Sequence, residues 1–569
     1  MESHCFYDTL KLLAYRHHES FHDSDLTYRI NLAKQILFNL ETKNWMYANN
    51  WVQKSCALEE LDITQQYVKQ YASLMKFTMG NAIKTWLNNF IQQPVLGKKY
   101  RKIGKNIQLY GPFDMGFSGP DIEFDLLCED NIPDYVENVF SECAKKGTVS
   151  IVLGAGNQNF LSFIDVLERI FIHKECVVLK HHPIRPFLWD PYEMLLEPLI
   201  KENIFYMILD DGIQFTQKLI HNPIVSHIHF TGSEDTFRSI NKELMAKNSS
   251  CKLSGELGCA TPWVIFPGKW SNNEMKNIAK MLVASKKANG GCNCLSVQSL
   301  ILPVNWEQTQ EFMETVLQEM VDQKTFPAYY PNTRKRKENW LNTYNDNYIH
   351  VHSSKKNKDT SFEQSDDMSV IYYGIIQSDE LISMDLNCDC FYNEIFGPIL
   401  VYSQLDYEKN NSLDFTNNLC NFLNSDKVCG SLSCSLFVPS SFPKEHLEKC
   451  IIDLHYGNIS INCSNIFGYS SALMGGTWGA HYRDKRSGRG RIGNIYKVPH
   501  VTKTILRGKT LETMKMDLSK PPSQFFMDLL FVLIVRSSDG FDMIYNGLSF
   551  LLFKFLSIFT YVYTGIECV

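Results

Sequence analysis

Two cysteines one residue apart, Cys292 and Cys294, lie in the glycine-rich segment NGGCNC at residues 289–294. A cysteine thiolate is a strong nucleophile that can bond covalently to a carbonyl carbon. A C-x-C pair can also bind a metal, and Cys388 and Cys390 form a second such pair. No histidine clusters nearby at the spacing of a zinc site, so we predict no metal site and expect a nucleophile. The alternative is that both thiols are buried and inert.

Five further short motifs accompany this segment along the chain. They are GAGN at 154–157, VVLK ending at Lys180, FTGS at 230–233, ELG at 256–258 and EIFGP at 394–398. Each motif alone is a weak signal. In this order and at these spacings they resemble the aldehyde dehydrogenase superfamily over roughly residues 110–510. The chain is longer than most members at its C-terminal end, where GGTWGAH at 475–481 is similar to a long branch of the superfamily.

The resemblance implies that Cys294 is the nucleophile. The family's loop reads Gly-Gln-x-Cys, and matching Gly291 to its glycine puts Cys292 at the glutamine position. Such enzymes oxidise an aldehyde to a carboxylate: the thiolate adds to the carbonyl, hydride leaves the thiohemiacetal, and water releases the acyl thioester. An unperturbed cysteine is mostly protonated at neutral pH, so we expect the surroundings of Cys294 to favour the thiolate.

Two more catalytic residues follow from the resemblance. Asn157 and the backbone N–H of Cys294 would donate to the developing oxyanion. Glu256 would be the general base that activates water. It lies 38 residues before Cys294 (294 − 256), slightly farther than the family usually shows, which indicates a small insertion. The alternatives are a turn residue for Asn157 and a solvated surface glutamate for Glu256.

The cofactor that the resemblance implies is NAD or NADP. Lys180 would bond the adenosine ribose, and Gly232 and Ser233 would open a helix whose N-terminus faces the pyrophosphate. Glu394 and Phe396 would hold the nicotinamide ribose and ring.

The chain departs from the family at three positions near these residues. After its lysine the family often carries a glutamate that bonds the ribose and repels a 2′-phosphate, whereas residues 181–183 here read His-His-Pro. A strict preference for NAD is therefore not predicted. Cys259 replaces the second glycine of the family's ELGG motif and Cys292 replaces the glutamine of the nucleophile loop, and both changes could reshape the pocket.

The elements that would position these residues begin at Thr148. Short apolar runs such as VSIVL, CVVL and FYMIL alternate with amphipathic helical stretches of about 10–15 residues, which is typical of a parallel sheet with crossover helices. Such a sheet binds ligands beyond the carboxyl ends of its strands, so the loops after Leu153, Leu179 and Phe230 are expected to form the site. Strand-like segments resume with LSCSLFVP and NISINC. We predict an α/β protein with an aldehyde-dehydrogenase-like fold: a Rossmann-type parallel-sheet cofactor domain plus a second α/β catalytic domain.

We predict four regions. Residues 1–110 form a helical region, because their apolar positions recur with a helical period. Residues 111–255 form the NAD(P)-binding domain, 256–465 the catalytic domain, and 466–569 a C-terminal segment with an apolar tail helix. Residues 548–563 are almost wholly apolar but fall short of the roughly 20 residues of a spanning helix. A helix docked on the protein or a partner subunit, and a tail associated with a membrane, are both open. The polar stretch 331–369, with RKRK, is expected to be a surface excursion.

The net charge and the cysteine content limit the other functions and locations that we expect. The net charge of −6 over 569 residues gives no electrostatic case for nucleic-acid binding. The 17 cysteines follow no small-scaffold spacing and no signal peptide is expected, so we predict a cytoplasmic protein with free thiols. By resemblance, the partners are a small aldehyde and further copies of the chain in a homo-oligomer. Two other functions stay open: an acyl-CoA-forming or acyl-reducing enzyme of the same superfamily, against which Glu256 argues, and an inactive nucleotide-binding scaffold, against which Cys294 and Asn157 argue.

Overall fold

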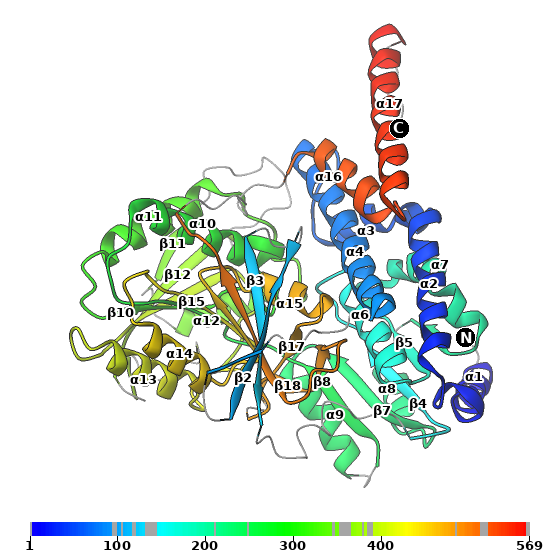
Figure 1. The fold of residues 1–569 in the computed structure, drawn as a ribbon, viewed down its shortest axis with the longest axis horizontal. Coiled ribbons are helices and arrows are strands. Elements are labelled where there is room, and N and C mark those ends of the chain that lie inside the picture. Colours follow the sequence, from blue (N-terminus) through cyan, green and yellow to red (C-terminus); the bar gives the residue numbers. More distant parts are fainter. Residues whose placement is uncertain are drawn as a thin grey trace.

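Two large sheets, each packed against helices, make up most of the protein (Figure 1). The computed structural model describes residues 3–93, 100–103, 106–116, 121–130, 145–209, 212–246, 250–343, 348–351, 366–377, 380–383, 391–483, 486–512 and 522–564. The second C-x-C pair, Cys388 and Cys390, lies outside the described residues. The α/β class predicted from the alternating pattern is confirmed.

The first sheet has six strands in the order β18-β8-β7-β4-β5-β6. All are parallel except β18, which runs antiparallel to β8. All five residues of β4, VSIVL, are buried because helices cover both faces of a parallel sheet. The strands are β4 (Val149–Leu153), β5 (Val177–Lys180), β6 (Phe205–Ile208), β7 (Val225–Thr231), β8 (Lys252–Glu256) and β18 (Gly488–Arg489). The helices between them are α6 (Leu161–Leu167), η4 (Glu168–Ile172), η5 (Pro186–Leu188), α7 (Trp189–Lys201), α8 (Ile213–Ile220) and α9 (Glu234–Ala246).

The chain order within this sheet defines where a ligand fits. From β4 the chain moves outward through β5 and β6, and then returns to the other side of β4 for β7 and β8. The carboxyl ends of β4 and β7 therefore flank a topological switch point, which is where doubly wound sheets bind ligands. The predicted loops after Leu153 and Phe230 lie at this point.

The second sheet has twelve strands, eleven of them in the order β1-β2-β3-β20-β16-β15-β9-β10-β14-β12-β11, with β13 paired to β12. Its central strands, from β20 to β12, are parallel. The strands are β1 (Tyr100–Lys102), β2 (Ile107–Asp114), β3 (Ile122–Glu129), β9 (Pro262–Ile265), β10 (Ser299–Pro303), β11 (Tyr348–Val351), β12 (Met368–Gln377), β13 (Glu380–Ser383), β14 (Ile399–Leu405), β15 (Ser433–Phe437), β16 (Asn458–Ile461) and β20 (Val501–Gly508). The expected strands in LSCSLFVP and NISINC are β15 and β16.

Seven helical segments accompany the second sheet, and a two-stranded ribbon lies beside it. The helices are α10 (Asn272–Lys287), η6 (Ala288–Gly291), α11 (Thr309–Asp322), α12 (Thr333–Thr343), α13 (Ser412–Leu423), α14 (Lys444–Asp453) and α15 (Ile466–Leu473). The ribbon pairs β17 (Thr477–Gly479) with β19 (Arg491–Gly493). The strands β2 and β3 belong to this sheet although they precede the first sheet in the chain, so the domain boundaries stay a prediction.

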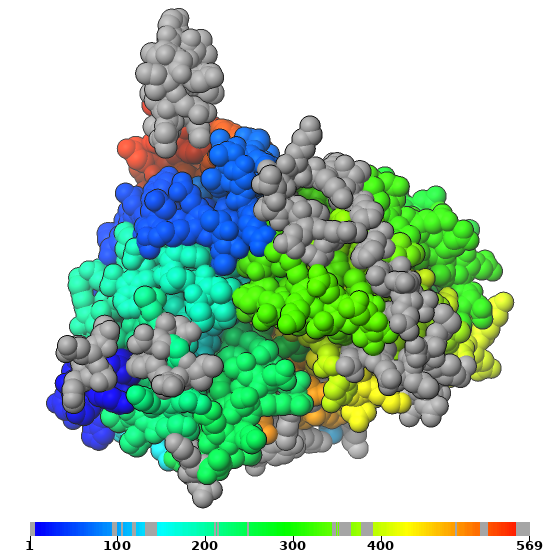
Figure 2. All heavy atoms as spheres, turned by 180° about the vertical axis from the view of Figure 1, so that it is seen from behind, coloured from blue at the N-terminus to red at the C-terminus, as the bar shows by residue number. Residues whose placement is uncertain are grey.

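The N-terminal residues form a helical layer on the six-stranded sheet. Its helices are α1 (Ser3–Arg16), η1 (His17–Phe21), α2 (Leu26–Thr42), η2 (Trp45–Asn50), α3 (Trp51–Leu58) and α4 (Gln66–Gln92). Trp86 and Phe90 of α4 pack against Phe171 of η4, with ring centroids 5.9 and 5.2 Å away. Figure 2 shows this layer between the C-terminal helices and the region of the first sheet.

The C-terminal segment forms α16 (Gln524–Leu530), η8 (Phe531–Val535) and α17 (Gly540–Thr564). The first two pack on α4, whereas α17 projects away from the body (Figure 1). Phe541, Ile544 and Leu548 are 79%, 65% and 63% exposed. None of the described helices has the length and apolar character needed to cross a membrane.

The basic run RKRK is not a free surface loop. It lies on α12, where Arg334 pairs with Glu60 at 2.6 Å and with Asp366 at 2.9 Å. Lys337 is 1% exposed and donates to the carbonyl of Asp367. Lys335 and Glu338 of this helix are exposed, as expected for a surface excursion, whereas Arg334 and Lys337 pair with carboxylates and a buried backbone acceptor.

Candidate active site

The loop that carries the two cysteines follows helix α10 and contains two closely packed glycines. Its preceding helix, α10, starts with a capping box in which Ser271 and Glu274 satisfy each other's backbone N–H groups. Past the helix, Gly290 and Gly291 have φ of 60° and 79°. A Cβ on Gly290 would lie 2.3 Å from the carbonyl oxygen of Pro327, so only glycine allows this close approach.

Cys294 and Glu256 are in contact. The thiol donates to Oε1 of Glu256 across 3.6 Å. Glu256 is the last residue of β8, so the carboxylate comes from the first sheet and the thiol from the loop before β10 of the second. The peptide of Cys294 is held by the Thr261 hydroxyl, which donates to its carbonyl at 2.7 Å.

Cys292 has a different environment. It is fully buried, and its sulfur lies 3.7 Å from the Thr333 hydroxyl and 3.7 Å from the carbonyl oxygen of Phe396. Its thiol faces a packed backbone rather than a carboxylate. The arrangement favours Cys294 as the nucleophile and Cys292 as a structural thiol.

The electrostatics of Cys294 differ from the sequence expectation. Burial, with the carboxylates of Glu256 and Glu394 adding to it, raises the pKa of the Cys294 thiol well above its ordinary value. The prediction that the surroundings favour the thiolate is wrong, because two carboxylates and a low dielectric both disfavour a second negative charge. Burial also raises the pKa of Glu256 to about 7, so this carboxyl can accept a proton near neutral pH.

Asn157 lies against the same loop. Its Nδ2 donates to the carbonyl of Cys292 at 3.2 Å. Its own carbonyl accepts from Asn289 Nδ2 at 2.9 Å, Arg185 Nη2 at 3.2 Å and the Tyr329 hydroxyl at 3.3 Å. The peptide of Asn157 is thus held by three donors, and its side chain points at the nucleophile loop.

The residues assigned to the cofactor divide into two groups. Lys180 ends β5, and Gly232 and Ser233 precede α9, so these three lie at strand ends beside the switch point. Ser233 accepts from the backbone N–H of Thr236 at 3.4 Å and begins the helix. The first turn of α9 carries Glu234 and Asp235, two carboxylates that oppose an anion at this N-terminus.

Glu394 and Phe396 form the second group, close to the cysteines. Oε1 of Glu394 accepts from the backbone N–H of Cys259 at 3.3 Å, and burial raises the pKa of Glu394 to about 7. Phe396 has a φ of 52°, and its ring packs edge-on against Tyr330 with centroids 5.1 Å apart. The Tyr330 hydroxyl lies 3.4 Å from Nε2 of His182. The contacting rings of His182, Tyr330 and Phe396 therefore connect the loop after β5 to the segment of Phe396.

The structure places Glu256, Asn157 and Glu394 around the loop that carries Cys294. The residues Lys180, Gly232 and Ser233 lie at the strand ends. Sequence reasoning missed Arg185, Tyr329 and Asn289. Asn289 opens the NGGCNC motif and was within reach of that reasoning. Arg185 and Tyr329 carry no local signal, because only folding brings them beside Asn157.

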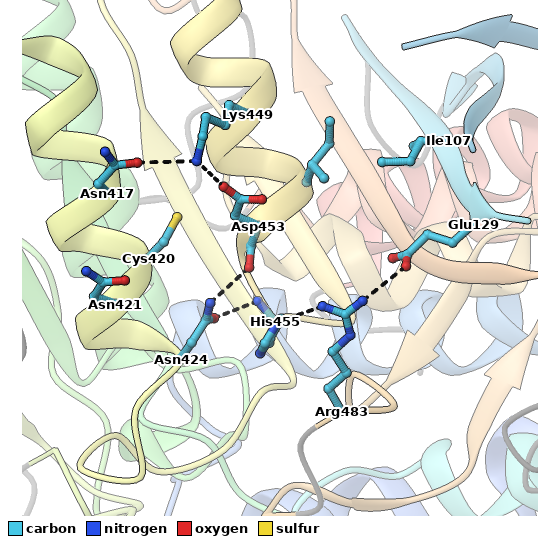
Figure 3. Close-up of a pocket in the computed structure, with 11 residues that line it drawn as sticks. Ile107, Glu129, Asn417, Cys420, Asn421, Asn424, Lys449, Asp453, His455 and Arg483 are labelled. Carbon is cyan, nitrogen blue, oxygen red and sulfur yellow. Dashed lines mark hydrogen bonds and ion pairs between the residues drawn. The ribbon is translucent and has the colours of Figure 1, made fainter. Parts of the chain in front are cut away.

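A cavity lies away from these residues. It has a volume of about 590 Å³ and lies between α13, α14, β3 and the segment of Arg483 (Figure 3). Its polar side chains already pair with one another: Lys449 with Asp453 at 2.5 Å, and Arg483 with Glu129 at 3.5 Å. None of the predicted site residues lines it.

Solved structures of known proteins share this architecture. Succinic semialdehyde dehydrogenase from Streptococcus pyogenes, solved with NADP+, superposes with a TM-score of 0.59 and 15% identity over 89% of this chain and 95% of its own. Betaine aldehyde dehydrogenase from Staphylococcus aureus, solved with NAD+, gives 0.57 and 15% over 89% of this chain and 88% of its own. At these identities the likeness shows the fold.

Sequence comparison points to the same group of proteins. The chain is 25% identical over 314 residues to a lactaldehyde dehydrogenase of Methanococcus maripaludis, a match that spans 54% of this chain and 58% of that relative. The sequence model of the aldehyde dehydrogenase family matches residues 176–505, more than half of the 569 residues. The chain therefore belongs to the aldehyde dehydrogenase family.

Proposed function

We propose that the protein oxidises an aldehyde to a carboxylic acid with NAD or NADP, through a covalent intermediate on Cys294. The observation that carries this proposal is the 3.6 Å contact between the Cys294 thiol and a Glu256 carboxyl whose pKa burial raises to about 7. A nucleophile and a base in contact are the minimum that acyl chemistry on a thiol requires.

The first step follows from the resting protonation state. The thiol is neutral, so its proton passes to Glu256 as the sulfur adds to the carbonyl carbon. An S–C bond forms and the carbonyl oxygen takes the negative charge. The backbone N–H of Cys294 and Nδ2 of Asn157 are the proposed donors to this oxyanion, since Asn157 already faces the loop.

The cofactor would be held by Lys180, Gly232, Ser233, Glu394 and Phe396. A cation at the end of β5 and a helix start at the switch point suit a dinucleotide, although Glu234 and Asp235 weaken the anion site at α9. When bound, the nicotinamide supplies a hydride acceptor. No carboxylate follows Lys180 in His181, His182 and Pro183, so NADP is as compatible as NAD.

Glu256 is also the proposed base for hydrolysis of the thioester. Glu256 first loses to solvent the proton that it took from the thiol. The carboxylate then takes a proton from water, the resulting hydroxide adds to the acyl carbon, and the C–S bond breaks to release the carboxylic acid and the thiolate of Cys294.

The test is NAD(P)H absorbance with the purified full chain and an aldehyde panel, with and without coenzyme A. The relatives suggest that lactaldehyde, succinic semialdehyde and betaine aldehyde should be included. We expect reduction of the cofactor and release of free acid without coenzyme A. A requirement for coenzyme A would indicate the acylating reaction instead. Cofactor binding without turnover on any aldehyde would indicate a scaffold.

A further inference from the structure

We propose that Arg185 is a positioning residue for Asn157 and that it couples the N-terminal helical layer to the active site. The catalytic part of this inference rests on the proposed function. Arg185 lies in the loop after β5 and is 1% exposed, although it is a cation that cannot lose its charge in a protein.

The guanidinium holds the backbone of the loop that carries Asn157. Its Nε donates to the carbonyl of Gly156 at 2.6 Å, and Nη2 donates to the carbonyl of Asn157 at 3.2 Å. Two consecutive peptides are thereby fixed by one planar group. Because a side chain leaves the backbone in a direction set by its peptide, this bond pair restricts where the amide of Asn157 can point.

Arg185 acts together with two other donors on the same carbonyl. Asn289 and Tyr329 donate to the carbonyl of Asn157, and the Tyr329 hydroxyl also lies 2.9 Å from Nη2 of Arg185. Asn289 belongs to the nucleophile loop. The carbonyl of Asn157 is therefore the point where the first sheet, the nucleophile loop and the segment before α12 meet.

The opposite side of the guanidinium faces the N-terminal layer. Nη1 lies 3.2 Å from the Ser55 hydroxyl of α3, and Nη2 lies 3.4 Å from Oε1 of Glu59, the C-cap residue of α3. Burial raises the pKa of Glu59, and Arg185 opposes this shift by stabilising the carboxylate. Removing Glu59 would leave a buried cation with less compensation, which predicts movement of Arg185 and of the peptides bonded to it.

An ion pair that served stability alone would leave the turnover of the folded enzyme unchanged. A positioning role predicts instead a loss of kcat that depends on Asn157. Small misplacements of a catalytic group can cost up to about 100-fold in rate.

The decisive experiment is a double-mutant cycle on kcat with Arg185→Lys, Asn157→Ala and the pair, in the full-length protein with NAD or NADP and its best aldehyde. Lysine keeps the charge but cannot form the fork to two carbonyls. We expect Arg185→Lys to lower kcat about 10- to 100-fold, with the KM for the cofactor unchanged. In the Asn157→Ala background the same change should have little further effect. Equal losses in both backgrounds would overturn the proposal.

Glu59→Gln changes the contact of Arg185 with the N-terminal layer and leaves the peptide of Asn157 untouched. This variant tests the proposal if Arg185→Lys fails to fold. The matched control is Lys84→Met, which removes another buried cation of the N-terminal layer. Lys84 bonds Glu41 and the carbonyl of Ser537, remote from Arg185. We expect Glu59→Gln to lower kcat several-fold, while Lys84→Met lowers only the melting temperature. Equal kcat in the two variants would contradict the coupling.

A readout independent of turnover separates this inference from the proposed function. Hydrogen–deuterium exchange of residues 154–160 should be faster in Arg185→Lys and Glu59→Gln than in wild type and Lys84→Met. If the wild type oxidises no aldehyde, the proposed function fails. The exchange still measures whether Arg185 holds the loop of Asn157 in place. Unchanged exchange in both variants would show that Arg185 does not hold this loop.

Discussion

The surroundings of Cys294 and the strand ends at the switch point differ in how firmly their side chains are held. Near Cys294, two sheets meet, and Glu256, Asn157 and Glu394 each accept or donate a bond to a neighbouring segment. At the switch point, Gly232 and Ser233 are exposed and two carboxylates begin α9. Chemistry needs fixed geometry, whereas a bound cofactor can itself order an exposed site. We therefore expect substitutions of Cys294, Glu256 and Asn157 to change rate, and substitutions of the residues proposed to hold the cofactor to change affinity.

The largest effect should come from the nucleophile. Cys294→Ala should lower aldehyde oxidation by at least about 10³-fold, because no S–C bond can form. Cofactor binding, measured by calorimetry, should be retained. The matched control is Cys292→Ala, which removes the buried thiol of the same loop and should leave kcat within about threefold. Activity in Cys294→Ala would disprove the covalent route.

The two carboxylates beside Cys294 should separate rate from affinity. Glu256→Gln should lower kcat about 10²- to 10³-fold by removing the general base. Acyl-enzyme should then accumulate and be visible by intact-mass spectrometry. Glu394→Gln should act mainly on the KM for the cofactor. If both variants showed the same pattern, the division of roles would be wrong.

The pH dependence of kcat should follow the ionisation of Glu256. The base works as a carboxylate, and burial raises its pKa to about 7. The rate should therefore rise about tenfold per pH unit below that value and level off above it. Steady-state kinetics from pH 5.5 to 9 measure the profile. A profile with no inflection near neutral pH would assign the base elsewhere.

The same carboxyl should make stability fall as pH rises. A carboxyl whose folded pKa lies above its unfolded value stabilises the fold at low pH, and this contribution is lost as pH rises through about 7. Glu256→Gln should thus be more stable than wild type at pH 8, by roughly 1–2 kcal/mol after allowance for its partial exposure, and not at pH 5. Urea unfolding at the two pH values measures the difference.

The smallest effect should come from the start of α9 at the switch point. Replacing Glu234 and Asp235 by Gln and Asn removes two charges that oppose an anion at the start of α9. Each charge is worth about 0.3–1 kcal/mol, so cofactor affinity should rise about 3- to 30-fold for the pair while kcat stays constant. Weaker binding would show that the pyrophosphate does not lie at this helix.

Much of the fold and part of the site followed from local patterns. The alternation after Thr148 predicted the strands and crossover helices, and the motif order placed Cys294 and Glu256, which the structure brings into contact. The protonation state of Cys294 did not follow, because it depends on carboxylates that are 38 residues before it and 100 residues after it in the chain. The ion pairs of Arg334 on α12 did not follow from the sequence for the same reason, since Glu60 and Asp366 are remote in sequence.

By itself the sequence determined which residue types are available and which secondary structure surrounds them, because hydrophobic period and glycine-rich turns act over a few residues. Only the tertiary structure decided that the Cys294 thiol is neutral, that Cys292 faces backbone, and that Arg185 reaches the carbonyl of Asn157. These properties depend on burial and on distances between segments far apart in the chain, and electrostatic and hydrogen-bond energies are set by those distances.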